Sequence, residues 1–343
     1  MLEIDGSKKS GSGTILRLSI AYSAITQEPL HIYNIRHNRR QPGLRPQHLE
    51  SVITAAKLCN AEMEGAKLGS RELWFNPNDI ISGEVSAKIG TAGSISMLIL
   101  AVLPICAHAN GDIKVNVVNG GTDVSFAPPI NYMKYVLLPV LERMGLKVSL
   151  TVKKFGYYPK GMGEVTLKVK YTSKLNPLCI EKFGELEEIK GVSVCTFLEK
   201  QRVAERQMKS ASNILRDHGY DAKIRVLYDR SNPFQRGSSL VLWAKTNNGA
   251  VLGGDAIGKL RKSSEAVGQE AAENLLTENK AKATVDVHLA DMLVPYVVMT
   301  NGTSTYLTRK ITDHLETNIW LTEKILDKKF EIKKVGNLYQ ITT

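Results

Sequence analysis

The sequence has few cysteines and no pair of them at a spacing that binds metal. Cys59, Cys106, Cys179 and Cys195 lie far apart along the 343 residues, and no C-x-x-C motif occurs. This pattern indicates neither a zinc site nor the disulfide framework of a small secreted protein. We expect all four thiols to be reduced and the protein to be cytoplasmic.

Long apolar runs and a leader segment are also missing. The longest apolar stretch, Met97–Ala107, is far shorter than the ~20 residues that span a bilayer, and it contains Pro104. The first residues, MLEIDGSKK, carry an acid and a turn, which is not the pattern of a signal peptide. We expect no membrane association.

The P-loop motif G-x-x-x-x-G-K-[ST] is absent as well. A different glycine-rich loop, with Gly6, Gly11 and Gly13, connects a predicted strand to a predicted helix. Such a turn can direct backbone N–H groups and a helix N-terminus at a phosphate. The loop Lys88–Ser94 has the same form, and there Ser94 or another hydroxyl could equally serve only to cap the next helix.

What the sequence does have is positive charge, with a formal net charge of +11 at pH 7. A basic surface attracts polyanions such as nucleic acid or nucleotides, although a solvated lysine-rich surface gives the same total. The most concentrated basic stretch is Arg36–His48, which holds four arginines and two histidines without an acid. Because arginine forks match pairs of phosphate oxygens, we favour phosphate binding by this loop.

Hydrophobic periodicity indicates a repeated βαβαββ unit. The first unit covers about 80 residues, the second covers residues 83–170, and the third lies at the end of the chain. In the second unit the pattern predicts a helix over 131–145, and in the third it predicts a strand over 283–289. The predicted fold class is α/β (α+β), with three such repeats forming the main domain.

A segment that does not follow the repeat separates the second and third units. It alternates predicted strands and helices of its own, enough for a small α/β domain. We predict a three-repeat catalytic domain made of residues 1–181 and 281–343, and a smaller inserted α/β domain at residues 182–280.

The stretch TDHLETNIW, Thr312–Trp320, carries a histidine at the start of a predicted helix. Asp313 is a candidate helix cap, with Glu316 three residues on at capping-box spacing. His314 then lies in the first turn, off the packed face, where the helix dipole lowers an imidazole pKa. A neutral imidazole is a competent nucleophile toward phosphorus. A surface histidine that tolerates a first turn is the alternative interpretation.

Taken together, these motifs resemble the RNA 3′-terminal phosphate cyclases. The shared signals occur in the family's order over nearly the whole chain, and they are H-x-x-T-N at His314–Asn318, R-x-x-R…P-G-L…Q-H at Arg36–His48, IG-x-AGS at Ile89–Ser94, GGTD with a following PP at Gly120–Pro129, LAD at Leu289–Asp291, and I-L-R ending at Arg17.

The resemblance implies a three-step reaction that uses ATP and a divalent metal, magnesium or manganese, on RNA 3′-phosphate ends. A histidine takes AMP from ATP, the AMP passes to the RNA 3′-phosphate, and the neighbouring 2′-OH closes a 2′,3′-cyclic phosphate. By position His314 is the nucleophile. The resemblance assigns the nucleotide to Arg17, Pro128, His288, Leu289, Ala290, Asp291 and Met292. It assigns substrate phosphates to Arg36, Arg39, Gln47 and His48.

The sequence departs from the family at several nucleotide-site positions. Ser10 stands where the family has a glutamate thought to help with metal and ATP, and a hydroxyl is a poorer magnesium ligand than a carboxylate. His288 replaces an aromatic residue and Met292 replaces a glutamine. Met162 stands in a glycine turn, where a positive φ is unfavourable for other residues. The metal ligands therefore stay unassigned.

Two other functions are compatible with parts of the pattern. One is a non-catalytic RNA-binding relative that acts in ribosomal RNA processing, which the loss of the loop glutamate favours and the presence of His314 opposes. The other is an enolpyruvyl transferase on a similar repeat fold, whose pattern the arginine loop does not match.

Overall fold

The computed structural model describes residues 1–343, and its first unit has the predicted βαβαββ order. Its elements are β1 (Leu2–Asp5), α1 (Gly13–Thr26), β2 (Leu30–Tyr33), α2 (Pro46–Cys59), β3 (Glu62–Glu64) and β4 (Leu73–Asn76). The four strands form a sheet in the order β1-β2-β4-β3, in which β1 and β2 are parallel. The parallel pair requires a crossover, which α1 supplies.

The second unit repeats this order. It contains β5 (Gly83–Lys88), α3 (Ile95–Ala107), β6 (Ile113–Gly120), α4 (Ile130–Tyr132), η1 (Met133–Leu137), α5 (Leu138–Arg143), β7 (Lys147–Lys154) and β8 (Gly163–Lys170). The sheet order is β5-β6-β8-β7. The single helix predicted over 131–145 is instead interrupted by the π-helical turn η1. Pro139 follows closely, and because it has no N–H it cannot continue the regular hydrogen-bond pattern.

The third unit is divided by the insertion. Its elements are β9 (Cys179–Ile180), α8 (Val287–Val297), β14 (Thr305–Thr308), α9 (Asp313–Leu326), β15 (Glu331–Val335) and β16 (Leu338–Thr342). The sheet order β9-β14-β16-β15 matches the other two. The strand predicted over 283–289 is wrong, because Val285 makes only an isolated bridge and Asp286 caps α8 through His288 N and Leu289 N.

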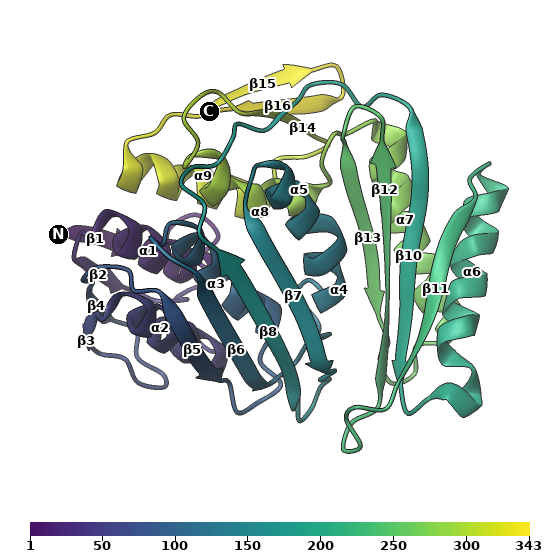
Figure 1. Ribbon diagram of the computed structural model, residues 1–343, viewed down its shortest axis with the longest axis horizontal. Coiled ribbons are helices and arrows are strands. Elements are labelled where there is room, and N and C mark those ends of the chain that lie inside the picture. Colours follow the sequence, from purple (N-terminus) through teal and green to yellow (C-terminus); the bar gives the residue numbers. More distant parts are fainter.

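The inserted segment forms a fourth sheet with two long helices. It contains β10 (Leu186–Thr196), η2 (Glu199–Gln201), α6 (Val203–Asp217), β11 (Ala222–Asp229), β12 (Gly237–Thr246), β13 (Val251–Ile257) and α7 (Ser264–Ala281). The strand order is β11-β10-β12-β13. Ser193 of β10 donates to Gln207 of α6, so the helices cover one face. The opposite face of the sheet meets the three-repeat body (Figure 1). There Trp243 stacks on Tyr135 with ring centroids 4.6 Å apart.

Helix α1 lies at the centre of the three-repeat body. Of its 14 residues, 12 are buried, and it packs against α2, α3 and α9. A single apolar core runs through the repeats and into the inserted sheet. The α/β fold class is therefore as predicted. No helix combines the length and apolarity needed to cross a bilayer.

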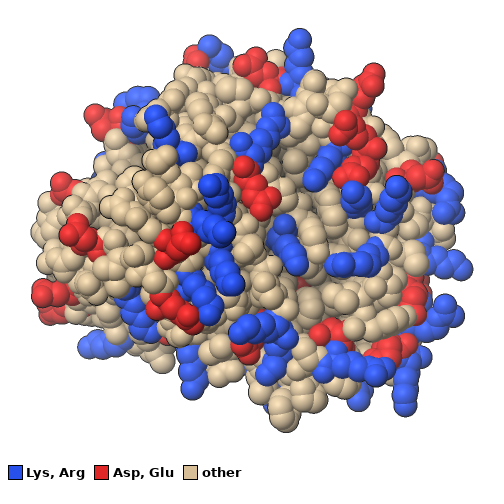
Figure 2. Space-filling model, in the orientation of Figure 1, with Lys and Arg blue, Asp and Glu red and all other residues tan.

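The net positive charge is spread over the surface. Figure 2 shows Lys and Arg side chains across one face, with Asp and Glu side chains between them. Lys147 of β7 and Lys168 and Lys170 of β8 belong to the exposed side of their sheet. Some cations are paired, as Lys153 is with Glu164 at 3.1 Å.

Candidate active site

A cavity of about 680 Å³ lies where the three repeats meet the inserted sheet. Its walls come from α1, the loop before α2 and the start of α2, α3, the turn before α4 and the end of α4, the end of β13, α7, α8, and the first two turns of α9. Ten of the residues predicted to bind nucleotide or phosphate line it: Arg17, Arg36, Arg39, Gln47, His48, Pro128, His288, Asp291, Met292 and His314. Leu289 and Ala290 have no exposed surface, so their side chains cannot touch a ligand there.

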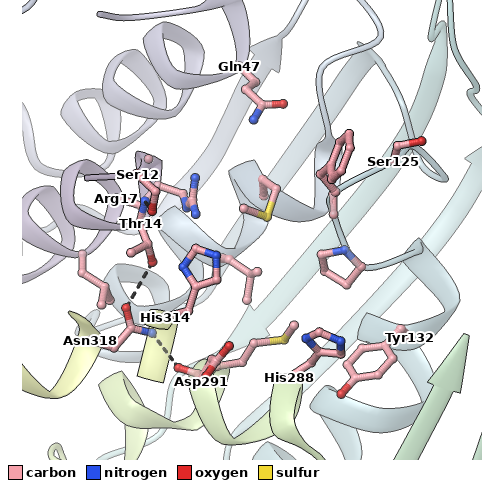
Figure 3. Close-up of a pocket in the computed structure, with 18 of the residues that line it drawn as sticks. Ser12, Thr14, Arg17, Gln47, Ser125, Tyr132, His288, Asp291, His314 and Asn318 are labelled. Carbon is pink, nitrogen blue, oxygen red and sulfur yellow. Dashed lines mark hydrogen bonds between the residues drawn. The ribbon is translucent and has the colours of Figure 1, made fainter. Parts of the chain in front are cut away.

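His314 is the second residue of α9, and its imidazole is open to the cavity (Figure 3). The cap of this helix is Thr312, whose hydroxyl accepts from Leu315 N at 3.0 Å; the prediction of Asp313 as the cap is wrong by one residue. Burial of the imidazole lowers the pKa of His314, and the positive charges of Arg17 and Arg39 lower it further. The imidazole is therefore held in the neutral form that a nucleophile needs.

Three arginines make one end of the cavity strongly positive. Arg17 is only 7% exposed, and burial together with Arg36 and Arg39 lowers its pKa to about 10. Arg36 donates to the carbonyl oxygens of Gln41 and Gly43, both at 2.8 Å. None of the three arginines has a carboxylate partner. Burial of a cation without a counter-ion raises the free energy of the folded protein, unless an anion binds there. Arg40 and Arg45 do not line the cavity.

A chain of hydrogen bonds fixes α1, α8 and α9 beside His314. Thr14 donates to Asn318 Oδ1 at 3.1 Å, and Asn318 Nδ2 donates to the backbone oxygen of Asp291 at 2.8 Å (Figure 3). The Thr312 hydroxyl donates to Asp291 Oδ1 at 2.6 Å. Burial raises the pKa of Asp291 to about 7. These bonds leave the imidazole of His314 in a defined position relative to both neighbouring helices.

Gln47 and His48 have structural contacts that the sequence did not indicate. Gln47 Oε1 accepts from Ser94 N at 2.7 Å, and the Ser94 hydroxyl caps α3 by accepting from Met97 N. His48 is 6% exposed, and burial followed by the charge of Arg17 lowers its pKa to about 2. His48 therefore contributes no charge to phosphate binding. A Cβ at Gly13 would lie 2.5 Å from His48 Nε2, so that position needs glycine.

The other end of the cavity is acidic and belongs in part to the insertion. The insertion contributes Asp255 of β13, Glu270 of α7 and one cation, Lys259, to the cavity lining. His288 lies between this end and His314. Burial raises the pKa of Asp255 to about 7. Sequence reasoning missed Asp255, because the inserted strand carries no motif and reaches the site only through the packing of the two parts.

A second cavity of about 400 Å³ meets the first at Arg39 and His314. Its lining has no apolar side chain and consists of Ser10, Asn38, Arg39, Lys310, Thr312, Asp313 and His314. Ser10, at the position of the expected metal ligand, is hydrogen-bonded to Ser12 and to Thr317. No cluster of three or more His, Cys, Asp or Glu residues could hold a metal ion.

Comparison with known proteins gives a consistent result. Residues 8–332 match the family model described as RNA 3′-terminal phosphate cyclase. RNA 3′-terminal phosphate cyclase from Pyrobaculum neutrophilum is 42% identical over 340 residues, covering 99% of this chain and 97% of the relative. The protein of that name from Pyrococcus furiosus is 42% identical over 333 residues, covering 97% and 95%. The one from Methanosarcina mazei is 40% identical over 360 residues, covering 100% and 99%.

A cavity lined by three arginines surrounds a histidine at a helix N-terminus, an arrangement that suits an anionic ligand. The family match covers almost the whole chain, and the chain belongs to the RNA 3′-terminal phosphate cyclase family. The resemblance stated from the motifs is confirmed.

Proposed function

We propose that this protein is an ATP-dependent RNA 3′-phosphate cyclase in which His314 carries AMP as a covalent intermediate. The observation that carries the proposal is that two cavities of different character meet at His314 and Arg39. The larger one, with apolar walls and an arginine end, suits a nucleoside triphosphate. The smaller, wholly polar one suits the end of an RNA strand.

In the first step, the neutral imidazole of His314 attacks the α-phosphorus of ATP. An N–P bond forms, and the bond between that phosphorus and the bridging oxygen of the leaving pyrophosphate breaks. Arg17, Arg36 and Arg39 supply positive charge without carboxylate partners. Fixed cations of this kind stabilise the charge that develops on the phosphoryl oxygens. The N-terminal end of α9 favours the same negative charge.

In the second step, an oxygen of the RNA 3′-phosphate attacks the phosphorus held on His314. The N–P bond breaks, AMP moves to the RNA end, and the imidazole is free again. The vicinal 2′-OH then attacks the activated phosphate, loses its proton, and expels AMP as the cyclic phosphate closes. Lys310, an exposed cation in the smaller cavity, and Arg39 are suited to bind the terminal phosphate before this exchange.

The expected divalent metal, magnesium or manganese, belongs to this proposal only as a companion of the ATP phosphates. Magnesium commonly binds through substrate phosphates and one or two carboxylates. Asp313 is the one carboxylate that lines the smaller cavity. No step described above depends on the ion. The cytoplasmic location likewise stays a prediction.

The alternative function is a non-catalytic RNA-binding relative that acts in ribosomal RNA processing. Ser10 in place of the family's glutamate favours it. The intact His314, with its lowered pKa and its unpaired arginine neighbours, favours the cyclase.

The test is incubation with α-³²P-ATP and magnesium or manganese, followed by a denaturing gel and acid treatment. We expect an acid-labile label on the wild type and none on His314→Ala. His37→Ala removes an exposed histidine of the basic loop that lines neither cavity, and it should label normally. With a 3′-phosphorylated RNA, the label should disappear as 2′,3′-cyclic ends accumulate. An unlabelled wild type that still binds RNA would support the alternative.

A further inference from the structure

The strand that closes the acidic end of the cavity belongs to the inserted sheet. Asp255 lies near the end of β13, directly opposite Val241 of β12. Gly253 lies two residues earlier on the same face, opposite Trp243, which stacks on Tyr135 of the three-repeat body. Since side chains alternate along a strand, Asp255 shares the face that meets the body. The cavity lining includes it for this reason.

The carboxylate of Asp255 has no hydrogen-bond or ion-pair partner in the protein. Its acidic neighbour Glu270 is paired, with Oε2 2.6 Å from Lys262 Nζ. The remaining cavity carboxylate, Asp291, accepts from Thr312. Burial is the main cause that raises the pKa of Asp255 to about 7, and the nearby charge of His288 opposes the shift. A partly buried carboxylate without a partner is unfavourable for folding, which points to a ligand as its partner.

Asp286 holds Asp255 and His288 in a fixed relation. This residue is 1% exposed. Its carboxylate accepts from Gly253 N at 2.8 Å, from the Tyr132 hydroxyl at 2.7 Å, and from His288 N at 3.0 Å. Asp255 follows Gly253 by two residues and His288 follows Asp286 by two. The acidic end is therefore rigid, as a site that selects a ligand must be.

The two ends of the cavity determine how a nucleotide can lie in it. Arg17, His314 and His288 follow one another across the cavity (Figure 3). Asp255 also lines the cavity, and the charge of His288 affects its pKa. We therefore place Asp255 beyond His288, away from the arginines. The phosphates of a nucleotide belong at the arginine end, because a carboxylate repels them. Its base then faces Asp255.

We propose that Asp255 is a specificity-determining residue, which accepts a hydrogen bond from the amino group of the bound base and so selects ATP over nucleotides without that group. This inference rests on the proposed function, because it assumes a nucleoside triphosphate at His314. An amino donor at Asp255 favours its ionised form, and a hydrogen bond to a charged group contributes enough to discriminate roughly 10- to 100-fold. A nucleotide that lacks the amino group leaves the carboxylate of Asp255 without a donor, and this loss is the physical basis of the selection.

The probe is purine riboside triphosphate, which differs from ATP only in lacking the 6-amino group. We expect the wild type to form the labelled histidine with a kcat/KM roughly 10- to 100-fold higher for ATP. Asp255→Ala should bring the ratio close to one, mainly by weakening the reaction of ATP. Asp255→Asn keeps an acceptor oxygen and should retain part of the preference. The control is Asp217→Ala, at the exposed end of α6 outside the cavity, with the wild-type ratio.

Equilibrium binding separates this inference from the proposed chemistry. Calorimetric titration of His314→Ala with each nucleotide reads the same preference without any reaction, and the double variant His314→Ala/Asp255→Ala should lose it. Thermal unfolding of Asp255→Ala should show no loss of stability, since no internal bond is removed. An unchanged ATP preference in Asp255→Ala overturns the inference. Selective ATP binding without any labelling of the wild type contradicts the proposed function and leaves the role of Asp255 standing.

Discussion

The hydroxyl of Thr312 donates to Asp291 Oδ1 at 2.6 Å while it accepts from the backbone N–H of Leu315 at 3.0 Å. One side chain therefore both caps α9 and ties it to α8. His314 lies between Thr312 and Leu315 in the sequence. Its position over the cavity depends on these two bonds.

Thr312→Val should remove both bonds with little change of volume. We expect unfolding in urea to become easier by about 1–2 kcal/mol, the usual cost of losing a helix cap. The rate of His314 labelling should fall by a larger factor than the affinity for ATP, because the first turn of α9 no longer holds His314 in position. Thr312→Ser keeps the oxygen and should behave as the wild type. Equal loss in both variants would contradict this role.

The charge of Arg39 should be visible in the pH dependence of labelling. Arg39 lowers the pKa of His314. Replacing it in Arg39→Gln makes protonation of the imidazole easier, so the pKa rises and the acid limb of the pH–rate profile moves to higher pH. Arg40→Gln, next in sequence but outside both cavities, should leave the limb in place. The position of the limb, rather than the maximal rate, is the measurement.

His48 should make the fold sensitive to acid. Its pKa is about 2 in the folded protein against a usual value of 6.5. Below pH 6.5 the unfolded chain takes up a proton that the folded protein refuses, so stability falls by about 1.4 kcal/mol per pH unit. Urea unfolding at pH 7.5 and pH 5.5 should show this loss in the wild type and a smaller one in His48→Gln. An identical pH dependence of the free energy of unfolding in the two proteins would exclude this role of His48.

Tyr132 should matter more for stability than its neighbour Tyr135. Tyr132→Phe deprives the buried carboxylate of Asp286 of one donor, at a cost of about 1–3 kcal/mol. The KM for ATP should also rise, because Asp286 positions the start of α8. In Tyr135→Phe only a 3.2 Å bond from the exposed Arg225 is lost, and stability should hardly change. Urea unfolding measures the loss of stability, and labelling kinetics measure the change in KM for ATP.

The sequence predicted the repeated units from local patterns, and the motifs shared with the family predicted ten of the 28 residues that line the larger cavity. Apolar periodicity locates the helices, and arginine spacing before α2 indicates a phosphate loop. The positive φ expected at Met162 is confirmed, at 63°. Three repeats of one strand order then bring His314 to Arg17 and Arg39.

What the sequence did not predict depends on tertiary contacts. The strand expected at 283–289 has the right alternation, but Asp286 caps a helix there. Tyr132 and Gly253, which are far away in the chain, also donate to its carboxylate and hold it in place. Asp255 carries no motif, and only the packing of the inserted sheet on the body brings it to the cavity. Thr312 and Asp313 are equally good caps by residue type. The bond to Asp291 distinguishes them.

The packing of α1 against α9 has a consequence for synthesis on the ribosome. Nearly all of α1 is buried in the finished protein, and Thr14 and Tyr22 bond to residues of α9 about 300 positions later. At roughly 5–20 residues per second, the first helix waits tens of seconds for its last neighbour. His314 also emerges only then, so under the proposed function a nascent chain that still lacks α9 has no residue to accept AMP.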